Sequence, residues 1–150
     1  MPDAQPVRAP RLVIAFDYGQ RRIGVACGDT LSGSATPLAA VLAGSHGQHW
    51  AAIEALVRDW QPALAIVGLP YNVDGSEGRM TAAARAFAAE LAARCRLQVE
   101  LVDERYSSLE AHSLLRDARA TGARNRRVSK ADVDAAAACV ILRRWITENS

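Results

Sequence analysis

The feature that most constrains this chain is an apolar segment that runs directly into a carboxylate. Residues 12–16 are all apolar, Asp17 follows at once, and a second mainly apolar stretch, residues 22–29, comes after a reversal that contains Gly19. A continuous apolar run is typical of a strand that is buried on both faces, and the short reversal predicts a hairpin. The pattern therefore predicts that Asp17 lies at the end of a central strand.

A charged side chain at the end of a buried strand needs a hydrogen-bond donor, a cation or a metal. The charge of Asp17 could be satisfied locally, because an aspartate in a turn can accept hydrogen bonds from the backbone of Tyr18 and Gly19. Whether Asp17 is a turn residue or a functional acid therefore depends on whether other carboxylates occupy equivalent places.

Length and composition favour one globular domain. The 150 residues are 50% hydrophobic and 23% charged, which is the balance of a chain that buries its own core. We expect residues 1–11, which are rich in proline, to be a disordered tail and residues 12–148 to form a single domain. No apolar run approaches the ~20 residues of a membrane span and no signal-peptide pattern opens the chain, so we expect a cytoplasmic protein without a membrane partner.

Cysteine and histidine usage does not favour disulfides or zinc. Cys27, Cys95 and Cys139 are an odd number of residues in distant apolar or alanine-rich segments, so we interpret them as small core residues. His46 and His49 have ligand-like spacing but no second ligand pair nearby, and we interpret them as solvated loop residues.

Hydrophobic periodicity predicts how strands and helices alternate. The predicted strands span residues 12–17, 22–29, 36–42, 63–68 and 99–103, and the predicted helices span residues 49–60, 81–94, 107–120 and 130–146. The order βββ-α-β-α-β-α predicts an α/β fold with a mixed five-stranded sheet and helices on both faces.

Two further carboxylates lack a local role. Glu104 follows the strand at 99–103, at the carboxyl end where open α/β sheets place ligands. Asp134 shares the apolar stripe of the last helix, whereas Asp132 faces elsewhere and caps the helix start. A salt bridge to Lys130, four residues earlier, is one explanation for Asp134.

Convergence of Asp17, Glu104 and Asp134 on one point is the other explanation. Clustered carboxylates are the oxygen-rich ligand set of Mg²⁺ or Mn²⁺, and two such ions ~4 Å apart can stabilise both the attacking and the leaving oxygen of phosphodiester hydrolysis. The residues thus indicate a metal-dependent phosphoryl-transfer enzyme in which these three acids are catalytic and bind the metal.

The distribution of charge indicates a polyanionic partner. The net charge is +2, but residues 116–130 hold six basic residues and one acid, which leaves the rest of the chain at −3. Solvation alone also accounts for such a segment. The glycine-containing loop at 68–78 can cradle phosphate through its backbone, or be an ordinary turn. The candidate nucleic-acid contacts are Arg21, Arg22, Asn72, Arg79, Arg105, Arg126, Arg127 and Lys130.

Four ordered motifs carry a resemblance to a known family. They are Asp17-x-Gly19 with Arg21-Arg22-Ile23-Gly24-Val25-Ala26; Gly68-Leu69-Pro70 with Asn72, Asp74, Gly75 and Ser76; Asp103-Glu104-Arg105; and Lys130 with Asp134-x-Ala136-Ala137. Over residues 12–146 the chain resembles the YqgF family, also called RuvX, of bacterial pre-16S rRNA nucleases, which are similar to Holliday-junction resolvases and have a ribonuclease H-like fold.

The resemblance implies a ribonuclease H-like domain whose acidic site is Asp17, Glu104 and Asp134 and which trims the 5′ end of pre-16S rRNA. Resolvases of this fold usually carry a further acid one turn along the last helix, where this chain has Ala137 and Ala138, so the number of metal ions stays open. The identity of the third acid also stays open between Glu104 and its neighbour Asp103.

Three other functions remain compatible with the sequence. A DNA junction resolvase would use the same chemistry as a dimer, and the sequence leaves monomer and homodimer open. A non-catalytic RNA-binding protein would use only the basic segment. An Asp-x-Gly hairpin also opens the ATPase domains of actin-like proteins and sugar kinases, but those enclose the nucleotide between two such domains and this chain supplies one.

Overall fold

The computed structural model describes residues 12–19, 21–43, 49–70, 72, 74–103 and 130–148. Along this part of the chain lie β1 (Leu12–Tyr18), β2 (Arg22–Asp29), β3 (Ser34–Leu42), α1 (His49–Trp60), β4 (Leu64–Leu69), α2 (Arg79–Cys95), β5 (Val99–Asp103) and α4 (Lys130–Glu148). The tail predicted at 1–11 and the helix predicted at 107–120 lie outside the described residues.

The strands form one mixed sheet in the order β3-β2-β1-β4-β5, with β1 at its centre. β2 is antiparallel to both β1 and β3, whereas β4 is parallel to β1 and β5 is parallel to β4. The predicted mixed five-stranded sheet is confirmed. Because β1, β4 and β5 run the same way, their carboxyl ends meet at one edge of the sheet, where β2 also begins.

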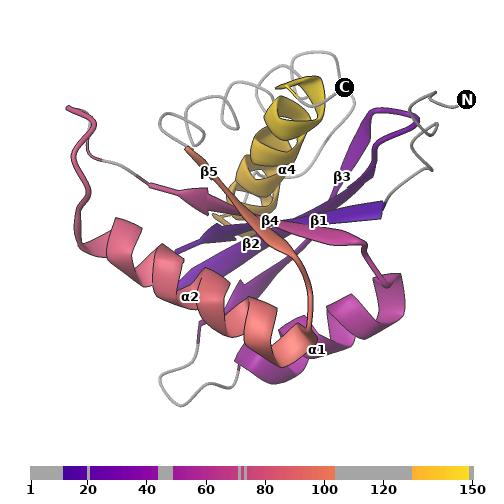
Figure 1. Cartoon of the computed structure of the whole chain (residues 1–150), viewed down its shortest axis with the longest axis horizontal. Coiled ribbons are helices and arrows are strands. Elements are labelled where there is room, and N and C mark those ends of the chain that lie inside the picture. Colours follow the sequence, from indigo (N-terminus) through magenta and orange to yellow (C-terminus); the bar gives the residue numbers. More distant parts are fainter. Residues whose placement is uncertain are drawn as a thin grey trace, which may run out of the picture.

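Helices cover both faces of this sheet, as predicted: α1 and α2 lie on one side and α4 lies on the other (Figure 1). The side chains of β1 alternate between the two layers. Ile14 and Phe16 pack in the cluster that contains Trp50 of α1 and Phe87 of α2. The intervening side chains of β1 pack on the side of α4, which we call the α4 face.

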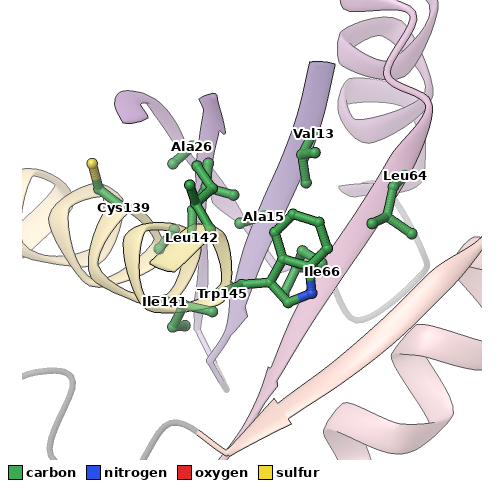
Figure 2. Packing of buried hydrophobic residues seen from close by; sticks show 11 residues of the cluster. Val13, Ala15, Ala26, Leu64, Ile66, Cys139, Ile141, Leu142 and Trp145 are labelled. Carbon is green, nitrogen blue, oxygen red and sulfur yellow. The ribbon is translucent and has the colours of Figure 1, made fainter. Parts of the chain in front are cut away.

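The α4 face is held together by large side chains of the helix and small or branched ones of the strands. Ile141, Leu142 and Trp145 pack in one cluster with Val13 and Ala15, and Figure 2 shows them between the helix and the strands. On β2 the residues of this face are Gly24, Ala26 and Gly28, so α4 lies close to that strand.

The cysteines occupy the places expected of core residues. All three are free thiols; Cys27 and Cys139 are buried and Cys95 is partly buried. Burial raises the pKa of each thiol above its ordinary value.

The prediction that His49 is a solvated loop residue was wrong, because His49 is the first residue of α1 and its ring lies against Trp50. His46 lies outside the described residues, and no helix in the described ranges is long and apolar enough to cross a membrane.

Candidate active site

Asp17 lies at the carboxyl end of the central strand, between two glycines. In the register of the sheet its neighbours are Gly24 on β2 and Gly68 on β4. Because Val13 and Ala15 belong to the α4 face and side chains alternate along a strand, the Asp17 carboxylate lies on that face too. The two glycines leave the positions beside this carboxylate without side chains.

Helix α4 carries Asp134 to the same place. A Cβ atom at Gly24 would overlap the backbone carbonyl oxygen of Asp134, so the start of the helix touches β2 at that residue. Gly24 is the cross-strand partner of Asp17, and directly paired residues of an antiparallel ladder have Cα atoms only ~5 Å apart. The fold therefore brings Asp17 and Asp134 together from opposite ends of the sequence.

Asp134 forms an ion pair that the sequence did not predict. The Nε of Arg22 donates a hydrogen bond to Asp134 Oδ2 at 2.7 Å, and the two side chains are 29% and 28% exposed. The salt bridge considered from the sequence paired Asp134 with Lys130, whose side chain is not among those that the structure describes. The partner comes instead from the first residue of β2.

The third acid is expected at the end of β5. This strand stops at Asp103, and Glu104 lies outside the described residues. On β5, Glu100 accepts a hydrogen bond from Trp145 Nε1 at 3.1 Å, and Val102 packs against the α4 cluster. Alternation therefore places Asp103 on the opposite face of the sheet from Asp134, which favours Glu104 over Asp103 as the third ligand.

The described residues contain no group of three or more His, Cys, Asp or Glu side chains that could hold a metal ion. Asp17 and Asp134 supply two acids of the predicted set, and the third falls outside this range. The donors are carboxylate oxygens, the ligand type that Mg²⁺ and Mn²⁺ accept, so the two described acids fit such an ion. Ala137 and Ala138, at the positions where the sequence resemblance implies a further acid in resolvases, are both fully buried.

The loop between β4 and α2 is held by its own hydrogen bonds. Asn72 Nδ2 donates to Ser76 Oγ at 3.0 Å, and the backbone N–H of Asn72 donates to the carbonyl oxygen of Ser76 at 2.9 Å. Asp74 Oδ1 accepts bonds from the hydroxyl and the backbone N–H of Ser76, which hold the pKa of the Asp74 carboxyl below its ordinary value. The Asn72 amide, predicted to bind nucleic acid, thus bonds within the loop.

Only two of the remaining candidate contacts, Arg21 and Arg79, have side chains among the described residues. Arg21 and Arg79 are exposed, at the start of β2 and of α2. Arg105, Arg126 and Arg127 lie outside the described residues, as does the side chain of Lys130. Their proposed roles in binding nucleic acid remain predictions.

Sequence reasoning missed three residues that shape this edge. Gly24 sets the approach of α4, and its signal was a glycine inside an apolar strand. Thr81 is fully buried; its hydroxyl donates to the carbonyl oxygen of Pro70 and accepts from Gly78 N–H at 3.1 Å. Arg85 forms a double hydrogen bond with Glu77, and nothing in the sequence indicated that pair.

Comparison with known proteins identifies the family. A profile described as "RuvX: Holliday junction resolvase" matches residues 11–148. A relative from Edwardsiella ictaluri, named "Putative pre-16S rRNA nuclease", is 46% identical over 136 residues, which are 91% of this chain and 94% of the relative. One of the same name from Yersinia pestis strain Pestoides F is 44% identical over 142 residues, or 95% and 99% of the two chains.

Solved structures support the same fold. Thermus thermophilus RuvC in complex with a Holliday junction superposes with a TM-score of 0.58 at 13% identity and covers 93% of this chain and 95% of RuvC. A second T. thermophilus RuvC structure gives a TM-score of 0.54 at 13% identity, with 92% and 95% covered. The fold is therefore that of RuvC, which is ribonuclease H-like, and by its sequence the chain belongs to the RuvX family.

Proposed function

We propose that this protein is a metal-dependent nuclease that hydrolyses phosphodiester bonds of precursor ribosomal RNA, at the 5′ end of pre-16S rRNA. The observation that carries the proposal is the convergence of Asp17 and Asp134, through Gly24, on one face of the sheet. The names of the relatives favour ribosomal RNA as the substrate. Such a substrate places the enzyme in the bacterial cytoplasm.

In this proposal Asp17, Glu104 and Asp134 hold Mg²⁺ or Mn²⁺. A bound divalent ion supplies two kinds of chemistry, since it polarises the scissile phosphate and lowers the pKa of the attacking water. Asp17 belongs to the central strand and Asp134 to a helix in backbone contact with its neighbour, so neither acid depends on a loop for its position.

A DNA junction resolvase is the second candidate, favoured by the description of the family profile. Its substrate has two-fold symmetry and requires two active sites, so this function needs a dimer. Cleavage of a structured RNA with the precursor 5′ extension, compared with cleavage of a four-way DNA junction, separates the two substrates. Size measurement in solution during both assays determines whether one or two chains act.

The site is tested by replacing each acid with its amide. Asp17→Asn, Glu104→Gln and Asp134→Asn should each remove most of the single-turnover cleavage, because an amide keeps the shape but loses the charge that holds the cation. The melting temperature of the metal-free Asp17→Asn and Glu104→Gln proteins should be retained or raised, since clustered acids repel one another. Asp134→Asn also loses the ion pair with Arg22, so its melting temperature should be lower than that of the other two variants. Excess chelator should abolish wild-type cleavage, and Ca²⁺ should restore it poorly because its longer bonds misplace the water.

Asp132→Asn is the matched control, because asparagine caps a helix start nearly as well as aspartate and should leave cleavage near the wild-type rate. Full cleavage in chelator would refute the metal site. A stable and fully active Asp134→Asn protein would remove α4 from the mechanism. If the protein bound RNA but cleaved it under none of the metal conditions, we would conclude that it is a non-catalytic RNA-binding protein.

A further inference from the structure

The ion pair between Arg22 and Asp134 differs from the other ion pairs of the described residues. It joins the start of β2 to the start of α4, 112 residues apart, and its side chains are 29% and 28% exposed. In the other described pairs both side chains are at least 42% exposed. Exposed pairs contribute little to stability, whereas a shielded pair retains more of its Coulomb energy. Arg22 is thus a persistent positive charge at an acid of the candidate site.

We infer that Arg22 is an internal counter-ion of the acidic site: it stabilises the metal-free protein and weakens the binding of the divalent ion. This inference rests on the proposed function, since it takes Asp134 as a metal ligand. It gives Arg22 a different role from the phosphate contact that the sequence predicted.

The geometry favours a charge effect over a positioning effect. The backbone of Asp134 is already fixed against Gly24, so Arg22 is not needed to place the helix. Arg22 binds Oδ2 of Asp134, so we take the other oxygen, Oδ1, as the one that would hold the metal. A metal on Oδ1 and a guanidinium on Oδ2 then repel each other. For a unit charge and a doubly charged ion roughly 6 Å apart, even a water-like dielectric corresponds to about tenfold in affinity.

The test measures Mn²⁺ binding without substrate, by the electron paramagnetic resonance signal of the free ion at fixed ionic strength. Arg22→Gln should bind Mn²⁺ about tenfold more tightly than the wild type, because the opposing charge is gone. In chelator its melting temperature should be a few degrees lower, and saturating Mn²⁺ should raise that temperature by more than it does in the wild type. Arg22→Lys keeps the charge and should stay near the wild-type affinity.

Arg58→Gln is the matched control, because it removes the same charge from an exposed pair with Asp59 on α1. It should change neither the Mn²⁺ affinity nor the melting temperature. An unchanged or weaker Mn²⁺ affinity in Arg22→Gln would overturn the inference. If that variant instead showed weaker RNA binding and a smaller salt slope at unchanged Mn²⁺ affinity, Arg22 would be a phosphate contact.

Failure of the proposed function gives a different result. Asp134→Asn is expected to weaken Mn²⁺ binding severalfold or more, and that loss establishes the site independently of Arg22. If the wild type bound no Mn²⁺, or if Asp134→Asn bound it as the wild type does, the metal site itself would be refuted and the inference with it. If Asp134→Asn lost binding while Arg22→Gln matched the wild type, only the role of Arg22 would be refuted.

Discussion

At the scale of single residues, the absence of a side chain at position 24 determines how closely helix and sheet approach. The backbone of α4 at Asp134 occupies the space that a Cβ atom of residue 24 would need. Position 24 is also paired with Asp17 in the sheet. One glycine therefore controls the separation of two acids that lie far apart in the sequence.

Gly24→Ala should push the start of α4 away from β2. Inserting a methyl group into a tightly packed contact costs about 1–3 kcal/mol of stability, and here the displaced group is the backbone that carries Asp134. We expect a lower melting temperature and a loss of cleavage larger than the loss of folded protein. Thermal melting and single-turnover cleavage, measured below the melting temperature of the variant, test this.

Gly33→Ala is the comparison for that substitution. Gly33 has φ of +70° and open space around its Cα atom, so alanine there introduces backbone strain without a collision. It should lower the melting temperature modestly and leave cleavage unchanged. Wild-type cleavage by Gly24→Ala would show that the position of Asp134 does not depend on this contact.

The sequence predicted which acids need an explanation but not how they meet. Asp134 was recognised because it lies on a helical stripe that packs on the sheet, and that stripe is observed. Its pairing with Arg22 was not predictable, because periodicity along one element carries no information about which strand lies opposite. The register that places Gly24 beside Asp17 is likewise a property of two strands together.

At the scale of elements, apolar periodicity predicted every strand and helix in the described ranges. The observed limits of β2, α1 and β5 match the predicted ones. β3 begins two residues early, at Ser34, because Ser34 pairs with Asp29 of β2. α2 also begins two residues early, at Arg79, because the hydroxyl of Thr81 accepts a hydrogen bond from the backbone N–H of Gly78, the residue before the helix. Both differences arise from polar bonds that a hydrophobic pattern does not record.

Thr81→Val tests the contribution of that threonine to the loop before α2. Valine has nearly the same shape but leaves the Pro70 carbonyl and the Gly78 N–H without their partner, a cost of about 1–3 kcal/mol. We expect a lower denaturation midpoint in urea and faster hydrogen exchange at the Gly78 amide. Thr81→Ser keeps the hydroxyl and should retain slow exchange at that amide. Equal exchange rates in the valine and serine variants would contradict the role assigned to the hydroxyl.

At the scale of the whole molecule, the sheet collects the carboxyl ends of β1, β4 and β5 at one edge. Acidic residues lie at this edge, and the basic segment predicted to hold RNA, residues 116–130, connects β5 to α4 in the sequence. A chain with a small net charge can therefore use acidic residues in one segment for catalysis and basic residues in another segment to bind RNA.

Replacing Arg126 and Arg127 with alanine should reduce RNA affinity without changing the chemical step. Each lost phosphate contact lowers the magnitude of the slope of log affinity against log salt by about 0.7–0.9, so the double variant should lose about 1.4–1.8. Filter binding over a range of salt concentrations gives the slope, and single-turnover cleavage at saturating enzyme gives the chemical step. Arg58→Ala should leave the slope unchanged, and an unchanged slope in the double variant would make residues 116–130 a solvated segment.

Helix α4 also contacts two strands of the sheet, one near each of its ends. Near its start it rests on β2 at Gly24, and near its end Trp145 Nε1 bonds Glu100 while Arg144 Nη1 bonds the carbonyl oxygen of Asp103 at 3.3 Å, both on β5. Asp134 and Trp145 lie about 16 Å apart along the axis of α4. The strand that leads to Glu104 is thereby clamped to the helix that carries Asp134. A change in the tilt of α4 would therefore move Asp134 relative to the end of β5, so the spacing of the acids depends on the contacts at both ends of this helix.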